Sequence, residues 1–476
     1  MSTTLTRPRS DDFDLVVLGA GPAGEKGAAK AAYFGKRVAI VEREPEPGGA
    51  AVHTGTLPSK TLRETALFLW GYRQRDLYGI SIQVESQLAV DKLIARKETV
   101  RHLETTRILG NLEAHGIELV RGHGRFIDAH TVEVSSGAGT RKLTAEAILI
   151  ATGSHPVHPS GIRFEDLNVH DSNTILGIKR VPDSLTVLGG GVIGCEYASL
   201  FAALGVDVHL VERRRRLLPF LDLEMGERLL RAMIDHGVAC HLDERVDNVR
   251  RTDGGDLECR LSSGMRLKSE KVLVTSGRSG NTGDLNLDAI GVATDARGFV
   301  VVDNEYRTAV PGIYAAGDVI GFPALASTSM EQARVAVDGA FGFASRQPVS
   351  TVVPYGVYTI PEVSCVGKSE QEAESEGIEI VVGRAFLRDN LRGQIVGDRD
   401  GMIKLLFERA TKRLIGCHCI GERASELVHV GQAAVALGGT IDTFIEMVFN
   451  YPTLGDAYKY AAYDALGRLS PGPSPG

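Results

Sequence analysis

No stretch of this 476-residue sequence is apolar over the roughly 18 residues that a membrane-spanning helix requires. Positive charge is not in excess, because the formal net charge is −7, which argues against a general binder of nucleic acid or anionic membranes. The six cysteines lack the spacing of a disulfide framework, and the polar residues 1–12 lack the apolar centre of a secretory signal. The sequence therefore predicts a protein of the reducing cytoplasm.

Several catalytic signatures are also missing. The sequence has no metalloprotease motif, no GxSxG elbow and no Walker phosphate loop. The triplet Cys417-His418-Cys419 does not predict a metal site, because alternate residues of a strand point to opposite faces and could not chelate one ion together. We therefore expect no metal centre.

Glycine, in contrast, is abundant, and one cluster of glycines stands at the start of a recognisable pattern. Residues 13–18 predict a buried strand that leads into the fingerprint Gly19-Ala20-Gly21-Pro22-Ala23-Gly24. A predicted helix then runs to Gly35, and a second strand over residues 37–41 ends at Glu42. This strand–helix–strand order with a terminal acid predicts a dinucleotide-binding fold.

Each residue of this pattern has a physical role. Gly19 permits the tight turn, Gly21 lets a pyrophosphate approach the backbone, and Gly24 lets the helix pack closely on the strand. Glu42 stands where a carboxylate can bind ribose hydroxyls. A glycine fingerprint without the flanking strands and acid is a weak signal, but here all of them are present.

The same pattern recurs 170 residues later, from Gly19 to Gly189. The strand and fingerprint over residues 187–194 and a second strand over 208–211 repeat the first set. The residue pairs that match in register are Ala28 and Ala198, Gly35 and Gly205, Glu42 and Glu212, and Arg43 and Arg213. Two such folds predict two dinucleotides, one resident and one exchanging.

Shorter elements fill the rest of the chain. We expect a long helix over residues 89–115, strands over 118–120, 131–134 and 147–150, a closing Ala151-Thr152-Gly153-Ser154 turn, and a second glycine–aspartate signal over 312–318. From residue 353 strands alternate with amphipathic helices, and residues 470–476 are rich in proline and glycine, which predicts a disordered tail.

The segment Gly48–Lys60 carries the most informative resemblance. A glycine doublet is followed by Pro58-Ser59-Lys60, with Lys60 at the start of a predicted helix over 61–72. Together with residues 194–199 and 449–453, this segment resembles the pyridine nucleotide-disulfide oxidoreductases, and within them the soluble pyridine nucleotide transhydrogenase subgroup. In that family two cysteines stand where this chain has Ala51 and Thr56, and a histidine stands at Tyr451. The resemblance therefore implies the family scaffold without its dithiol.

The resemblance implies an α/β fold with two Rossmann-like domains, for FAD and for NAD(P), and a C-terminal α+β dimerisation domain that forms a homodimer or a higher homo-oligomer. The implied segments are 12–158 and 284–350 for the FAD domain, 159–283 for an inserted NAD(P) domain, and 351–469 for the interface domain. The implied catalytic residues are Lys60, Glu196 and Tyr451. The implied cofactor-binding residues are Gly19, Gly21, Gly24, Glu42, Arg43, Gly48, Gly49, Ala50, Ala51, Lys60, Gly124, Gly153, Asp318, Ala326, Gly189, Gly191, Gly194, Glu212, Arg213, Val246 and Gly277.

Three of these positions have a plainer alternative. The family places Lys60 and Glu196 together near flavin N5, where the ammonium would stabilise negative charge on reduced flavin, although the pattern alone fits a surface lysine and a solvated glutamate. Ala326 precedes a predicted helix over 328–343 that the family aims at the flavin, but periodicity alone indicates only an amphipathic helix. Cys195 faces about 100° away from Glu196 and fits a small buried residue.

Glu212 and the following residues Arg213-Arg214-Arg215-Arg216 leave the choice of coenzyme open. A glutamate at this strand end suits the ribose of NAD, whereas Arg213 and Arg214 suit the 2′-phosphate of NADP. Both together indicate a site that accepts either coenzyme, and the alternative is a solvated basic turn.

The sequence thus predicts hydride transfer between NADPH and NAD⁺ through FAD, with NAD(H) and NADP(H) as exchanging substrates. An NAD(P)H diaphorase, oxidase or quinone reductase on the same scaffold is the alternative enzyme. A non-catalytic FAD-binding protein with a structural or regulatory role is the alternative of another class. We expect no nucleic-acid or membrane partner.

Overall fold

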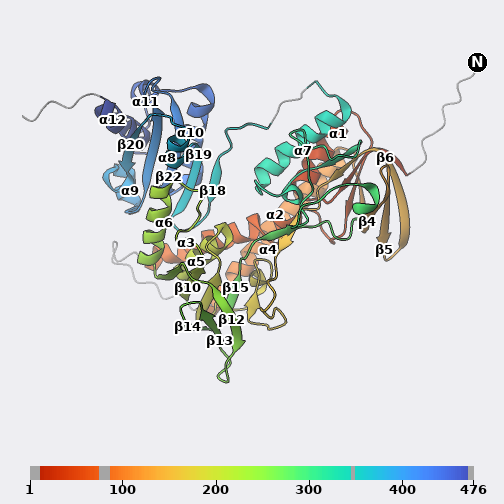
Figure 1. Cartoon of the computed structure of the whole chain (residues 1–476), viewed down its shortest axis with the longest axis horizontal. Helices are drawn as coiled ribbons and strands as arrows, with labels where there is room; N and C mark the ends of the chain where they lie inside the picture. Colours follow the sequence, from red (N-terminus) through yellow and green to blue (C-terminus); the bar gives the residue numbers. More distant parts are fainter. Residues whose placement is uncertain (1–10, 74–85, 345–348, 470–476) are drawn as a thin grey trace, which may run out of the picture. The chain divides into compact units, whose positions relative to one another are not determined.

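The computed structural model describes residues 11–73, 86–344 and 349–469 (Figure 1). The predicted disordered tail, residues 470–476, lies outside these residues, as do residues 1–10. The chain divides into two compact units. The first contains Met1–Leu62, Asp91–Val157 and Ser276–Val349, and the second contains Arg63–Val90, His158–Thr275 and Ser350–Gly476.

A seven-stranded sheet forms the centre of the first unit, in the order β3-β2-β1-β6-β5-β4, and β17 pairs with the C-terminal end of β6. The strands around β1 are parallel, and β4, β5 and β6 form an antiparallel meander. The strands are β1 (Asp12–Leu18), β2 (Val38–Glu42), β3 (Glu118–Arg121), β4 (His123–Asp128), β5 (Thr131–Ser136), β6 (Gly139–Ile150) and β17 (Ile313–Ala315).

Helices α1 (Pro22–Tyr33) and α7 (Ala326–Phe341) of this unit pack against each other. Leu15 and Val17 of β1 contribute to the core cluster on one face of the sheet, and Val16 and Leu18 to the cluster on the other face. A strand buried on both faces is a continuous apolar run rather than an alternating one, which is how residues 13–18 read in the sequence.

Three helices, α2 (Gly49–His53), α3 (Thr56–Arg73) and α4 (Ser86–Ala114), lie between β2 and β3 in the sequence. Helix α3 begins at Thr56, five residues before the helix predicted over residues 61–72. Pro58 stands in the first turn of α3, where its missing N–H costs no helical hydrogen bond. Lys60 is inside α3 and not at its start, which corrects the expectation from the sequence.

The second unit contains a five-stranded parallel sheet in the order β11-β10-β9-β15-β8. Its strands are β8 (Val169–His170), β9 (Ser184–Leu188), β10 (Asp207–Glu212), β11 (Val238–Leu242) and β15 (Lys271–Val274), with helices α5 (Val192–Ala203) and α6 (Leu223–Asp235). Strands β12 (Val246–Arg251), β13 (Leu257–Leu261) and β14 (Arg266–Ser269) form a separate antiparallel sheet.

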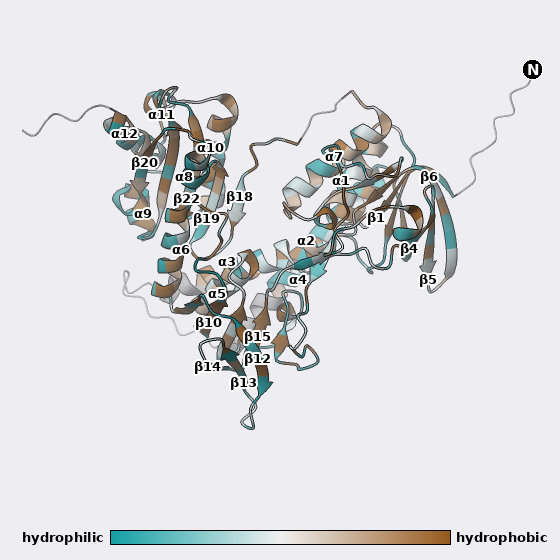
Figure 2. Cartoon of the chain, viewed as in Figure 1, coloured by the Kyte–Doolittle hydropathy of each residue, from teal (hydrophilic) through white to brown (hydrophobic). Residues whose placement is uncertain are grey.

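The C-terminal part of the second unit is a five-stranded antiparallel sheet in the order β18-β19-β22-β21-β20. Its strands are β18 (Tyr355–Val357), β19 (Glu362–Gly367), β20 (Ile380–Phe386), β21 (Met402–Glu408) and β22 (Leu414–Gly421). The helices of this part are α8 (Glu370–Ser375), α9 (Leu391–Val396), α10 (Ala424–Leu437), α11 (Ile441–Glu446) and α12 (Ala457–Leu469). Brown, hydrophobic segments alternate with teal, hydrophilic ones along the strands of these sheets in Figure 2.

The predicted repeat is confirmed in both sequence and structure. Helices α1 and α5 each contain 12 residues and begin at Pro22 and Val192, which are 170 positions apart. The turn that precedes each helix has its first glycine at positive φ, +103° at Gly19 and +112° at Gly189. Only glycine adopts such values without strain, so the fingerprint spacing was a reliable structural signal.

Candidate functional site

The glycine turn of the first unit is shaped by close backbone contacts. A Cβ atom at Gly24 would lie 1.9 Å from the carbonyl oxygen of Gly19, and a Cβ at Gly19 would lie 2.5 Å from that of Ala151. Gly21 precedes α1 and has no side chain to cap it, so the N–H groups of the first turn remain available to an anion. The turn therefore fits a pyrophosphate group.

Glu42 ends β2 beside this turn. Its Oε2 atom accepts a hydrogen bond from the Ala20 N–H at 2.8 Å, and its Oε1 atom accepts one from the Glu44 N–H at 2.9 Å. Each carboxylate oxygen retains a further lone pair, so the group can also accept hydrogen bonds from ribose hydroxyls. This arrangement fits the ribose of a dinucleotide. Arg43, which is predicted to belong to the same site, has a half-exposed side chain. Its Nε atom lies 3.6 Å from Oε1 of Glu44, and its Nη1 atom lies 3.6 Å from Oδ2 of Asp284.

The glycine doublet of the predicted redox segment lies against the same turn. Gly48 donates its N–H to the carbonyl of Ala20 at 2.8 Å, and a Cβ at Gly49 would lie 2.9 Å from the Cα of Gly21. Both glycines have positive φ, +123° and +56°. The structure thus brings the first glycine turn, residues 19–24, next to residues 48–51. Ala50 and Ala51 lie in α2.

Asp318 is held next to another predicted segment of the first unit. Its Oδ2 atom accepts a hydrogen bond from the Ser154 hydroxyl at 3.2 Å, beside Gly153. The preceding residue, Gly317, has a φ of +83° and donates its N–H to Oε1 of Gln332 at 2.9 Å. Ala326 is the first residue of α7, so this helix starts two residues before the predicted position.

Gly124 plays a packing role. It lies in β4, where a Cβ would be 3.0 Å from Leu18 and 3.2 Å from Val41 side-chain carbons. Gly277 has a φ of +113°, and its carbonyl accepts the N–H of Val157. Val246 is the half-buried first residue of β12 and pairs with Leu261.

The second unit repeats the first arrangement around Gly189. A Cβ at Gly194 would lie 1.8 Å from the Gly189 carbonyl oxygen, and Gly191 precedes α5 without a side chain to cap it. Oε2 of Glu212 accepts the Gly190 N–H at 2.6 Å, and Oε1 accepts the Arg214 N–H at 2.9 Å. This turn also fits the pyrophosphate and ribose of a dinucleotide.

Arg214 distinguishes the second site from the first. Its guanidinium donates to both carboxylate oxygens of Glu212, with Nε at 2.8 Å and Nη2 at 2.9 Å. Burial alone would raise the pKa of Glu212, but the hydrogen bonds from Arg214 and from the backbone outweigh it and hold this pKa below its ordinary value. Arg214 is therefore engaged by Glu212, and the neighbouring Arg213 is exposed.

The three predicted catalytic residues are distributed over both units. Lys60 belongs to the first unit, and Glu196 belongs to the second, where its Oε1 atom accepts the Tyr358 N–H at 2.9 Å. Tyr451 also belongs to the second unit and its side chain is largely exposed. The convergence of these three residues on one flavin stays a prediction.

Cysteine chemistry has little support at these positions. The first cysteine of the chain is Cys195, so α2 and the start of α3 contain none, and all six cysteines are free thiols. Burial raises the pKa of Cys195 well above its ordinary value and that of Cys240 to about 11. Cys417 and Cys419 face the same side, with their Sγ atoms 3.9 Å apart, whereas His418 bonds the Lys368 carbonyl, which confirms the predicted alternation.

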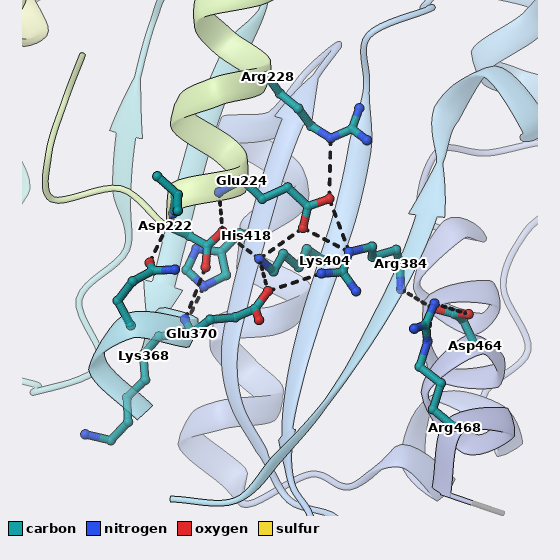
Figure 3. A network of polar contacts seen from close by, with 12 residues as sticks. Asp222, Glu224, Arg228, Lys368, Glu370, Arg384, Lys404, His418, Asp464 and Arg468 are labelled. Atoms are coloured by element: carbon teal, nitrogen blue, oxygen red, sulfur yellow. Dashed lines mark hydrogen bonds and ion pairs between the residues drawn. The ribbon is translucent and has the colours of Figure 1, made fainter. Parts of the chain in front are cut away.

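One group of carboxylates resembles a metal site. Among the described residues, Asp222, Glu224 and Glu370 bring ligand atoms close enough to hold an ion. However, the Lys404 ammonium occupies this cluster and pairs with all three, as Figure 3 shows. A buried cation already satisfies these carboxylates, so the cluster is an ion-pair network.

Sequence reasoning missed two polar residues that shape the turns. Gln332 lies in α7 and fixes the Gly317 backbone, and no local pattern distinguishes it from a solvated helical residue. Thr275 follows β15, donates its hydroxyl to the Leu188 carbonyl at 2.9 Å, and closes the space beside Gly194. A polar residue directly after a buried parallel strand is a usable signal, because strand ends of this kind line ligand sites.

Two glycine turns, each followed by a carboxylate that bonds the turn, define a class of α/β protein that binds two dinucleotides. The chain matches the family model for pyridine nucleotide-disulphide oxidoreductase over residues 13–340 and the model for the dimerisation domain of that family over residues 353–462. The chain belongs to the pyridine nucleotide-disulphide oxidoreductase family. This family is FAD-dependent and uses NAD(P), which agrees with the fit of both turns.

Relatives and solved structures cover nearly the whole chain. A soluble pyridine nucleotide transhydrogenase of Mycobacterium tuberculosis (strain ATCC 25177 / H37Ra) is 44% identical over 460 residues, 96% of this chain and 98% of the relative. A protein of the same name from Colwellia psychrerythraea is 40% identical, covering 97% and 99%. The crystal structure of LpdA from M. tuberculosis is similar with a TM-score of 0.87 and 28% identity, covering 96% and 99%. The flavoprotein disulfide reductase RclA from Escherichia coli has a TM-score of 0.86 and 26% identity, covering 95% and 99%.

Within the part of the chain that the structure describes, no helix combines the length and apolar character needed to cross a membrane.

Proposed function

We propose that this protein is an FAD-dependent pyridine nucleotide transhydrogenase that passes hydride between NADPH and NAD⁺ without a redox-active disulfide. One observation carries the proposal: both dinucleotide turns are complete, whereas Ala51 and Thr56 stand at the two positions of the family dithiol. The relatives named soluble pyridine nucleotide transhydrogenase support the same activity.

The residues of the first unit have a binding role in this function. The amides at the start of α1 and the Glu42 carboxylate hold the pyrophosphate and ribose of FAD. FAD, when bound, supplies a carrier that accepts and returns two electrons with one proton. Lys60 contributes a cation that stabilises negative charge in the flavin site.

The second turn admits the two coenzymes one after the other. Gly191 and Glu212 bind the features that NADPH and NAD⁺ share, and Arg213 meets the 2′-phosphate that only NADPH carries. NADP⁺ leaves before NAD⁺ enters, because one site serves both. One hydride leaves NADPH and one arrives on NAD⁺, so no other reactant is consumed.

The assembly is proposed on the same basis. The C-terminal segment matches the dimerisation domain of the family, so we expect a homodimer in which this domain forms the interface. Six free thiols agree with a cytoplasmic location.

The test is NADPH-dependent reduction of thio-NAD⁺ by the purified yellow protein, with the concentrations of both substrates varied. We expect parallel double-reciprocal lines and no turnover of lipoamide or glutathione disulfide. Rapid turnover of a quinone or oxygen with no reduction of thio-NAD⁺ would replace this function with a diaphorase or oxidase. A flavin band that NADPH fails to bleach without oxygen would indicate a non-catalytic FAD-binding protein.

A further inference from the structure

A short two-stranded sheet lies next to Asp318 in the first unit. It pairs β7 (Ser154–Pro156) with β16 (Arg278–Gly280) in antiparallel orientation. From β16, the Arg278 side chain makes two contacts with Ser154. Its Nη2 atom donates to the Ser154 carbonyl at 2.7 Å, and its Nε atom donates to the Ser154 hydroxyl oxygen at 2.7 Å. One guanidinium therefore holds both the backbone and the side chain of Ser154.

These contacts determine where the Ser154 hydroxyl hydrogen points. A guanidinium can only donate hydrogen bonds, so the Ser154 oxygen accepts from Nε of Arg278. The hydroxyl hydrogen is then left for a different acceptor, which is Oδ2 of Asp318 at 3.2 Å. Arg278, Ser154 and Asp318 thus form a chain of hydrogen bonds in which the direction of each bond is fixed.

The Asp318 backbone is held by a separate contact, because the preceding Gly317 N–H donates to Oε1 of Gln332 at 2.9 Å. That bond places the residue but leaves rotation about its side-chain bonds open. Among the described residues, Ser154 makes the one hydrogen bond to the Asp318 carboxylate. The orientation of this carboxylate therefore depends on the Ser154 hydroxyl, and through it on Arg278.

The same segment lies beside the glycine turn of the first unit. A Cβ at Gly317 would lie 3.1 Å from the Cβ of Ala23, which belongs to the first turn of α1. While Oδ2 of Asp318 accepts the Ser154 hydroxyl, no described residue donates a hydrogen bond to Oδ1. A carboxylate oxygen offers two lone pairs, so Oδ1 can accept a hydrogen bond from a hydroxyl group of FAD.

We propose that Arg278 is a positioning residue for FAD: through the Ser154 hydroxyl it holds the Asp318 carboxylate in the orientation that leaves Oδ1 open to the cofactor. This inference rests on the proposed function, in which the first unit binds FAD. Backbone pairing of β7 with β16 holds the two segments together without the Arg278 side chain. Loss of the guanidinium therefore frees the hydroxyl to rotate while the small sheet remains.

The experiment dilutes the flavin-loaded full-length protein and measures the dissociation constant of FAD from the fluorescence of the released flavin. In Arg278→Met we expect FAD to bind roughly fivefold to tenfold more weakly, because the hydrogen bond that orients a charged acceptor is lost. Ser154→Ala removes the hydroxyl itself and should weaken FAD by a similar factor. This second variant carries the test if Arg278→Met fails to fold.

The double variant Ser154→Ala/Arg278→Met distinguishes a chain of hydrogen bonds from two independent contacts. Because Arg278 acts through the Ser154 hydroxyl, its substitution should have no further effect once that hydroxyl is gone. We therefore expect the double variant to bind FAD within about twofold of Ser154→Ala. Ser154→Thr keeps a hydroxyl at this position and should retain most of the parental affinity.

Arg141→Met is the matched control. Arg141 is a half-buried arginine of β6 whose guanidinium also bonds two groups, with Nη1 2.6 Å from Oε1 of Glu118 and Nη2 2.7 Å from Oδ1 of Asp11. Neither of these partners contacts the Asp318 carboxylate. We expect this variant to keep the parental affinity for FAD, whatever its effect on the melting temperature.

The outcomes are separable. If Arg278→Met lowers the melting temperature but keeps the parental FAD affinity, the residue is only structural and the inference is overturned. The inference is also overturned if Arg278→Met weakens FAD by the same factor with and without the Ser154 hydroxyl. A parental protein that binds no FAD would instead contradict the proposed function.

Discussion

Glu42 and Glu212 hold the same position in their two turns: each accepts the N–H of the residue after the first glycine, Ala20 at 2.8 Å and Gly190 at 2.6 Å. Each also accepts the N–H of the residue two positions after itself in the sequence, which is Glu44 for Glu42 and Arg214 for Glu212. The two turns differ in the side chain of this residue. In the first turn it is the acidic Glu44, and in the second it is the Arg214 guanidinium, which pairs with the Glu212 carboxylate. The first carboxylate is therefore left to the ligand, whereas the second is already partly neutralised.

The two glycine turns should be separable by mutation. Gly24→Ala places a Cβ 1.9 Å from a backbone oxygen, so we expect loss of most flavin. Gly194→Ala creates the same conflict in the second turn, at 1.8 Å. It should keep its flavin and transfer hydride roughly a hundredfold more slowly, because the coenzyme is displaced.

Flavin absorbance per chain and the rate of thio-NAD⁺ reduction measure these effects. Gly110→Ala is the control, since a Cβ there meets nothing within 4 Å in α4. Full flavin content in Gly24→Ala would contradict the assignment of the first turn.

Arg213 and Arg214 should respond differently to substitution. Arg213→Ala removes a charge-assisted contact to the 2′-phosphate, which is worth about 1.5 to 3 kcal/mol, and should weaken NADPH while leaving NADH nearly unchanged. Arg214→Ala instead leaves Glu212, whose side chain is 3% exposed, without its guanidinium, and should weaken both coenzymes. Michaelis constants for both coenzymes provide the measurement. Equal effects of Arg213→Ala on NADPH and NADH would assign this run of arginines to a solvated turn.

Glu25 should make the first unit sensitive to acid. This buried carboxylate accepts hydrogen bonds from Lys26, Arg107 and Asn111. Burial opposes its ionisation, but Arg107 and Lys26 outweigh burial and hold its pKa below the ordinary 4.5. A lowered folded-state pKa gives stability that is present above pH 4.5 and is lost as the pH falls through the folded-state value.

Glu25→Ala should therefore lower the free energy of unfolding by about 1 to 3 kcal/mol at pH 7, and by less under acidic conditions. Denaturant unfolding at pH 7 and near pH 4 measures the difference. Glu146→Gln, at a largely exposed carboxylate of the same unit, is the control and should change little. A pH-independent loss in Glu25→Ala would show that packing, and not ionisation, is the cause.

The sequence predicted those parts of the fold in which the contacting residues lie within one βαβ unit. Gly19, Gly24 and Glu42 stand within one βαβ unit, so their spacing determines their contacts, and the repeat at Gly189 follows the same geometry. The sequence predicts too late a start for the helix that contains Lys60, because proline often precedes a helix, although it is also compatible with a first helical turn. Local patterns therefore give the elements well and their ends less well.

Lys404 could not have been placed from the sequence. A lysine inside the apolar run Met402–Glu408 does signal a buried charge, which requires a partner. That partner, Asp222, is 182 residues away, and nothing in either segment specifies the other. The same limit applies to Gln332 and Gly317, because both contacts depend on how separate segments fold together.

The buried pair of Asp222 and Lys404 has a consequence for the order in which the chain is made. Asp222 leaves the ribosome 182 residues before Lys404, the cation that pairs with it. Chains fold in the direction of synthesis, so the parallel sheet around β10 can form while Lys404 is still untranslated. During that interval Asp222 is without the ammonium that pairs with it, so this buried ion pair is completed only after β21 has been synthesised.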